Sequence, residues 1–140
     1  MYLPIKGTEL AEEGERSEAV EQTETILIVE DEVIVSSALQ AGFEDYGYTV
    51  LLSIDGAEGL ETFRREQDRI DLVMMDLSMP TMTGEELLPQ LLALNPALKV
   101  IVFSGYPVDP EDLPGIAKIV TKPVQTDDMV EILREVLDSP

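Results

Sequence analysis

Five short runs of apolar residues alternate with longer segments of helical spacing along this chain. The runs are Thr25–Glu30 (TILIVE), Tyr48–Ser53, Leu72–Met75, Val100–Phe103 and Ile116–Val120. The first is an uninterrupted, largely β-branched stretch, which is typical of a strand buried on both faces of a parallel sheet. We therefore predict five strands, in this order along the chain.

The segments between these runs predict helices. Helical spacing indicates one from Val33 to Tyr46, with Gly47 suited to the stop after it. Two sequences fit acidic capping boxes and should open the next two helices, the first running to about Arg69 and the second stopping by Asn95-Pro96. These boxes are Asp55-Gly-Ala-Glu58 and Thr83-Gly-Glu-Glu86. Thr126-Asp127-Asp128 should cap the final helix, which extends to about Leu137.

The fourth crossover looks different from the others. It joins the run ending near Ser104 to the run ending near Lys122, and Pro107, Pro110 and Pro114 lie inside it. Interior prolines remove backbone donors and clash with the preceding helical turn. We expect a shortened or irregular fourth helix here.

Strands that alternate with helices at this chain length imply βαβ crossovers and a parallel sheet covered by helices on both faces. The fold class is therefore α/β, a (βα)₅ doubly wound five-stranded parallel sheet, and we assign it to residues 25–139. Residues 1–24 carry seven glutamates and almost no periodic apolar signal, so we interpret them as an acidic linker or tail.

Composition restricts the chemistry and the partners. With 29 acidic and 9 basic residues, the net charge of −20 would repel nucleic acid backbones and anionic lipid. No apolar run approaches the ~20 residues that span a bilayer. We expect a cytoplasmic domain without nucleic acid or direct membrane contact. The chain has neither histidine nor cysteine, so its chemistry must use carboxylates, hydroxyls and lysine.

Chemically coherent residues stand where the predicted strands end. Glu30 and Asp31 follow the first strand, Asp76 the third, Ser104 the fourth and Lys122 the fifth. Reactive groups of doubly wound sheets gather at the carboxyl ends of the strands. Clustered carboxylates repel each other unless a hard cation with oxygen ligands holds them, and Mg²⁺ fits best. A lysine and a hydroxyl nearby suit the binding of phosphoryl oxygens.

In these motifs the chain resembles the receiver domains of two-component response regulators, from about residue 25 to residue 137. Val29-Glu30-Asp31-Glu32 is similar to the acidic pair of that family. The stretch from Met75 to Gly84 (MDLSMPTMTG) is similar to its phosphoacceptor loop, and Ser104-Gly105 and Lys122-Pro123 to its signalling hydroxyl and lysine. The resemblance implies a flavodoxin-like receiver fold.

It also implies a role for each residue. Asp76 would be the nucleophile that takes a phosphoryl group from the phosphohistidine of a histidine kinase or histidine phosphotransfer domain, in cis or in trans. Asp31, Asp76 and the backbone carbonyl of Ser78 would bind Mg²⁺ directly, with Glu30 acting through a metal-bound water. Lys122 and Ser104 would hold phosphoryl oxygens. The domain would thus catalyse its own phosphorylation and dephosphorylation without being a stand-alone enzyme.

Two further features concern signalling and origin. Ile119 stands three residues before Lys122, where the family usually has an aromatic residue that reports phosphorylation. Met1-Tyr2-Leu3-Pro4-Ile5 resembles the last strand of a histidine-kinase ATP-binding domain. This order, strand then acidic linker then receiver, is that of hybrid sensor histidine kinases, whose C-terminal receiver this would be. The parent chain could then be membrane-associated.

Two alternatives remain open from the sequence. One is a degenerate receiver that binds a partner without being phosphorylated, against which the intact Asp76, Asp31 and Lys122 argue. The other is an aspartyl-phosphate hydrolase on a similar sheet. Such hydrolases place a second aspartate two residues after the nucleophile as acid and base, and that position is Ser78 here.

Overall fold

The computed structural model describes residues 23–140, in which five parallel strands form one sheet in the order β3-β2-β4-β5-β6. The strands are β2 (Thr25–Val29), β3 (Thr49–Ser53), β4 (Leu72–Asp76), β5 (Lys99–Ser104) and β6 (Lys118–Thr121). Every residue of β2 and β4 is buried, whereas the edge strands β3 and β6 carry exposed positions. The predicted doubly wound (βα)₅ architecture is confirmed.

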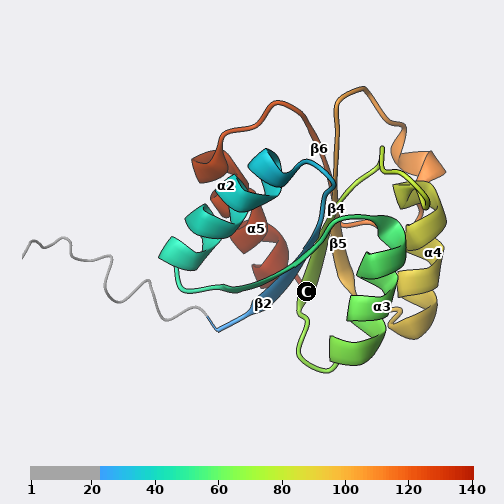
Figure 1. Cartoon of the computed structure of the whole chain (residues 1–140), viewed down its shortest axis with the longest axis horizontal. Helices are drawn as coiled ribbons and strands as arrows, with labels where there is room; N and C mark the ends of the chain where they lie inside the picture. The colour runs from blue at the N-terminus through green and yellow to red at the C-terminus, as the bar shows by residue number, and fades with distance from the viewer. Residues whose placement is uncertain (1–22) are drawn as a thin grey trace, which may run out of the picture.

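Helices cover both faces of the sheet (Figure 1). On one side lie α2 (Val33–Asp45) and α5 (Thr126–Asp138), and on the other α3 (Gly56–Glu66) and α4 (Gly84–Leu94). Each face has its own apolar core: Phe43 and Leu133 pack with Met74 on the first, and Phe63 and Leu91 with Met75 on the second. Neighbouring residues of β4 thus serve opposite cores, as the pleat of a strand requires.

The N-terminal caps of α3, α4 and α5 can be compared with the capping residues predicted from the sequence. Thr83 and Glu86 form the reciprocal capping box expected for α4. Asp55 caps α3 by accepting from the Glu58 N–H, although the Glu58 carboxylate accepts from the N–H of Ile54. The prediction for α5 is wrong in detail, because Thr126 is its first helical residue and the cap is Gln125, which makes no side-chain hydrogen bond to the helix.

The crossover from β5 to β6 contains no α-helix. A single 3₁₀ turn, η1 (Pro110–Asp112), stands in its place, so the predicted irregular fourth helix is confirmed. Leu113 is buried in the core beside α3 and α4, and Val108 and Ile116 pack partly against the same cluster. Strand β6 begins at Lys118, two residues later than predicted.

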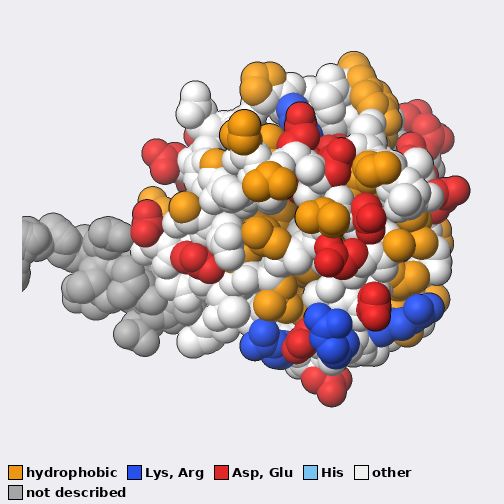
Figure 2. Space-filling model, viewed as in Figure 1, with side chains coloured by type: hydrophobic (Ala, Val, Ile, Leu, Met, Phe, Trp, Pro, Cys, Tyr) orange, Lys and Arg blue, Asp and Glu red, His pale blue; other side chains and the backbone are white. Residues whose placement is uncertain are grey.

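The strand order reverses between β2 and β4, since β3 lies to one side of β2 and the chain then crosses to β4. In sheets of this kind, the loops beyond such a switch point form a crevice. Figure 2 shows acidic side chains spread over the viewed face, with most of the basic ones gathered along one edge. Among the described residues, no helix has the length and apolar character needed to cross a membrane.

Candidate functional site

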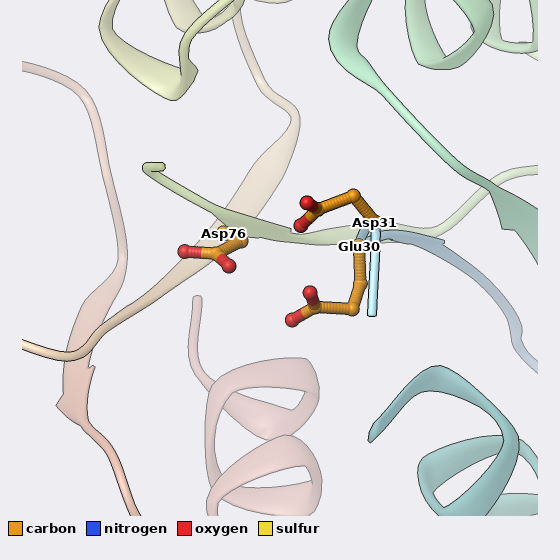
Figure 3. A group of neighbouring side chains, drawn as sticks. All are labelled: Glu30, Asp31 and Asp76. Atoms are coloured by element: carbon orange, nitrogen blue, oxygen red, sulfur yellow. The ribbon is translucent and has the colours of Figure 1, made fainter. Parts of the chain in front are cut away.

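Three carboxylates meet at the carboxyl ends of β2 and β4. Glu30 and Asp31 directly follow β2, and Asp76 is the last residue of β4. These strands pair side by side, with Val29 opposite Met75. One carboxylate oxygen from each of Glu30, Asp31 and Asp76 lies within 4.8 Å of the others (Figure 3). The structure therefore brings together the three acids that the sequence assigned to one site.

Lys122 reaches this cluster from the end of β6. Its Nζ lies 3.0 Å from Asp76 Oδ2, 3.2 Å from Glu30 Oε1 and 3.6 Å from Glu32 Oε1. The Lys122 N–H donates to the Ser104 carbonyl at 2.7 Å, which ties the lysine backbone to the end of β5. One cation thus contacts three carboxylates from two different strand ends.

The two serines of the predicted site behave differently. The Ser78 N–H donates to Asp76 Oδ1 at 3.1 Å and so orients that carboxylate. The Ser104 hydroxyl forms its hydrogen bonds with Tyr106 instead of with the charged residues: it donates to the Tyr106 carbonyl at 2.8 Å and accepts from the Tyr106 N–H at 3.1 Å. Ser104 therefore lies beside the site, but its hydroxyl is hydrogen-bonded within the loop that follows β5.

An open pocket of about 430 Å³ lies over the cluster. It is lined by Asp31, Glu32, Asp76, Ser78, Gly105, Tyr106 and Lys122. A Cβ added to Gly105 would meet no atom within 4 Å, so this part of the wall carries no side chain and faces open space. The pocket gives a small anionic group access to the Asp76 carboxylate.

Burial and crowding of like charges alter the acid–base properties of the cluster. Glu30 is 1 % exposed, and this burial, followed by the charge of Asp76, raises the pKa of its carboxyl to about 7, against the opposing effects of the Glu32 N–H and of Lys122. Burial by itself lowers the pKa of Lys122. Its hydrogen bond to Asp76 and the charges of Asp76 and Glu30 outweigh that effect, so the pKa lies above its ordinary value.

The donor set fits a hard divalent cation. The three candidate ligands that converge here, from Glu30, Asp31 and Asp76, are carboxylate oxygens, and magnesium prefers oxygen donors at such sites. Four carboxylates, with Glu32 included, gather at these strand ends, and three of them contact a single lysine. Excess negative charge of this kind favours binding of a cation.

Sequence reasoning missed two contributors. Tyr106 and Gly105 line the pocket, and Tyr106 holds the Ser104 hydroxyl. No residue-type signal could have shown this, because Tyr106 acts through its backbone groups. Glu32 was noted only as part of the acidic run, and its contact with Lys122 depends on how α2 begins.

The comparisons with known proteins agree with this geometry. Residues 26–134 match the model of the response regulator receiver domain family. The chain belongs to this family. It is a receiver domain of two-component signalling, homologous to phosphoaccepting CheY-like domains, and neither of the two alternatives is favoured.

Relatives of this receiver domain include parts of much longer proteins. It is 34 % identical over 118 residues to the sensor kinase CckA of Brucella abortus, a match that covers 81 % of this chain and 12 % of that kinase. It is 29 % identical over 117 residues to the transcriptional regulatory protein GlrR of Escherichia coli, covering 81 % of this chain and 26 % of the relative. The chain thus spans only a fraction of the length of these relatives.

Solved receiver domains share its fold. The receiver domain of the hybrid histidine kinase CckA superimposes with a TM-score of 0.72 at 30 % identity, covering 81 % of this chain and 99 % of that one. The response regulator TrrA of Thermotoga maritima, solved in complex with Mg²⁺ and BeF, gives 0.73 at 25 % identity, covering 81 % and 98 %. In both matches about four fifths of this chain shares the receiver fold.

Proposed function

We propose that this receiver domain accepts a phosphoryl group on Asp76 from a phosphohistidine, in a reaction that requires Mg²⁺. The observation that carries the proposal is the convergence of Asp76, Lys122 and the acidic pair from three separate strand ends. Asp76 is the acid that Lys122 contacts most closely, and it is also the acid that faces the open pocket beside Asp31. We assign Asp31, Asp76 and the Ser78 carbonyl as the groups that would bind Mg²⁺ directly, with Glu30 acting indirectly, through a water. When bound, it would neutralise charge on the phosphoryl oxygens.

The chain's own residues supply the rest of the chemistry. A carboxylate oxygen of Asp76 attacks phosphorus, forming an O–P bond while the P–N bond of the donor breaks. The released electron pair stays on the departing imidazole nitrogen, which is then protonated. The Ser78 N–H fixes the plane of the Asp76 carboxylate, and the Lys122 ammonium can move from Asp76 to an oxygen of the transferred group.

The donor is a histidine kinase or a histidine phosphotransfer domain. Because this chain contains no histidine, the phosphohistidine belongs to another segment or another protein. The likeness to a hybrid kinase receiver supports an origin in a hybrid sensor histidine kinase, and with it a cytoplasmic location. The net charge of −20 supports a protein partner rather than nucleic acid or anionic lipid.

Acetyl phosphate labelling tests the proposal. The protein is incubated with acetyl phosphate, with Mg²⁺ or with EDTA, and weighed by mass spectrometry. We expect one added phosphoryl group with Mg²⁺ only, and none in Asp76→Asn. Asp71→Asn is the matched control, because it makes the same change just before the other end of β4, where its side chain accepts from the Thr25 N–H. Labelling that persists in Asp76→Asn or in EDTA contradicts the proposal, and sustained turnover of p-nitrophenyl phosphate would indicate a hydrolase.

A further inference from the structure

Phe103 stands between the acceptor carboxylate and the lysine that contacts it. Strands β4 and β6 are not neighbours, because β5 lies between them. In the strand register, Phe103 of β5 is opposite Asp76 of β4 on one side and opposite Val120 of β6 on the other. Lys122 is the next residue after Val120 on the same face of β6. To contact Asp76, Lys122 must therefore reach across β5 at the position of Phe103.

The pleat of the sheet places these side chains on one face. Phe103 packs in the apolar core beside α2 and α5. Met74, two positions before Asp76, belongs to the same core. Val120, two positions before Lys122, belongs to it as well. Since alternate residues of a strand share a face, Asp76, Phe103 and Lys122 project from the sheet in the same direction.

The lysine ammonium contacts the aromatic ring as well as the acids. Lys122 Nζ lies over the Phe103 ring, 5.1 Å from the ring centroid. This is inside the limit of about 6 Å for a cation–π interaction. The same atom lies 3.0 Å from Asp76 Oδ2 and 3.2 Å from Glu30 Oε1. Phe103 itself is 1 % exposed, so the ring is a fixed surface under a lysine whose side chain is 22 % exposed.

Core packing alone does not call for an aromatic residue at this position. Phe103 is the one aromatic residue of β5, and Ile101, its neighbour on the same face of that strand, is aliphatic. An aliphatic side chain fills the core but offers no negative ring face to a cation. The aromatic residue therefore stands where the sheet carries the lysine ammonium over it.

The ring matters most when the acids are occupied. In the free domain, Asp76, Glu30 and Glu32 hold the Lys122 ammonium by ion pairs. Once these charges are partly neutralised by a divalent cation, their hold on the ammonium weakens, and the partly exposed side chain can turn to solvent. The Phe103 ring takes no part in binding the cation, so its attraction for the ammonium persists in the state that reacts.

We propose that Phe103 is a positioning residue for Lys122: its ring face supports the lysine ammonium on its way from β6 to the acceptor carboxylate of Asp76. The ring keeps the ammonium beside Asp76 while its ion pairs with the acids are exchanged for a contact with the transferred phosphoryl group. This inference rests on the proposed function and adds an apolar residue to a site otherwise built from charged and polar groups.

Fluorinated phenylalanines at position 103 of the full chain test this role. Ring fluorines withdraw electrons from the ring face and weaken its attraction for a cation, while the ring keeps nearly the same size. Proteins with one, two or three fluorines on this ring are labelled with acetyl phosphate in Mg²⁺. Labelling of Asp76 should slow with each fluorine, by about threefold with three, the scale of one cation–π contact at a partly exposed site. A ring that only fills the core would give one rate along the series.

A double-mutant cycle in the free protein supplies a second measurement, without labelling. Lys122→Met removes the charge and keeps a side chain of similar length. In urea unfolding, fluorination of Phe103 should lower the midpoint more in the lysine chain than in the methionine chain, because only the lysine chain has a cation to lose. The matched control places the same fluorinated residues at Phe63, in the core on the opposite face of the sheet, where labelling should keep its rate.

The two measurements separate the two proposals. If Asp76 is labelled at the same rate along the fluorine series, the positioning role of Phe103 is wrong and the acceptor function stands. If no labelling occurs in any protein, the acceptor function fails, and the urea cycle still decides whether the ring holds the ammonium. Equal responses of the lysine and methionine chains in that cycle overturn the proposal.

Discussion

The two ends of the sheet handle charge in opposite ways. At the amino end, Arg134 pairs with Glu24 at 2.9 Å and with Asp138 at 2.8 Å, and Lys99 donates to the carbonyls of Leu137 and Ser139. At the carboxyl end, three acids share Lys122 and a fourth, Asp31, lies beside them. At the amino end the basic groups are paired within the chain, whereas at the carboxyl end the acids outnumber the lysine that contacts them. This difference separates the part of the molecule that maintains the fold from the part that reacts.

Magnesium should produce the largest change in stability, because it binds carboxylates that converge only in the folded state. At ~100 times its Kd, the gain in unfolding free energy should be about 2.7 kcal/mol. Asp31→Ala should abolish the rise in melting temperature with Mg²⁺. Asp68→Ala, which removes an exposed acid beyond the end of α3, should keep that rise. An equal response in both variants would place the metal elsewhere.

A smaller effect is expected from acid titration of the amino end. The hydrogen bond from Arg134 holds the pKa of Glu24 below its usual value, although burial opposes this. A carboxyl whose pKa is depressed by folding stabilises the protein above its unfolded pKa of about 4.5, and this contribution is lost as the pH falls through the folded value. Glu24 is partly exposed, so we expect less than about 1 kcal/mol.

The measurement compares urea midpoints of wild type and Glu24→Gln between pH 7 and pH 3. The variant should be less stable at pH 7, and the difference should vanish toward pH 3. Glu61→Gln, at an exposed position of α3 that forms no ion pair within residues 23–140, is the control and should follow the wild type. A difference between wild type and Glu24→Gln that stays constant with pH would mean that Glu24 acts through packing, not through charge.

Deleting the acidic tail should have the smallest effect. Residues 1–22 lie outside the described part of the chain, and their composition offers little apolar surface to bury. Removing them should change the urea midpoint by an amount equivalent to less than ~0.5 kcal/mol. Removing residues 1–24 should cost more, because it also takes away Glu24 and its bond to Arg134. A large loss already on removal of residues 1–22 would show that the tail docks on the domain.

Much of the fold and the arrangement of the charged site follow from local rules. Uninterrupted apolar runs predicted the central strands, and the convergence of strand ends predicted that Glu30, Asp31, Asp76 and Lys122 would meet. The start of β6 was predicted two residues too early. Ile116 is apolar, but it packs partly against the core cluster and precedes the strand. Thr126 was taken for a cap because its residue type favours that position, but the backbone turns one residue earlier, at Gln125.

The hydrogen bonds between Ser104 and Tyr106 lay beyond sequence reasoning for a different reason. Any residue other than proline has the N–H and the carbonyl that Tyr106 offers to Ser104. What makes them special is the path of the chain after β5, which depends on the absence of a fourth helix and on the burial of Leu113. Side-chain patterns report on packing and charge, and only indirectly on where a loop presents its main chain.

Gly105 leaves part of the pocket wall without a side chain, and this bears on how long Asp76 would stay phosphorylated. Water must reach the phosphoryl group to end the phosphorylated state, and the bare wall at Gly105 leaves that approach open. Because an added Cβ there meets no atom within 4 Å and the backbone is not in the left-handed region, larger residues fit without strain. We therefore expect larger residues at this position to lengthen the lifetime of the phosphorylated state while the stability of the domain stays the same.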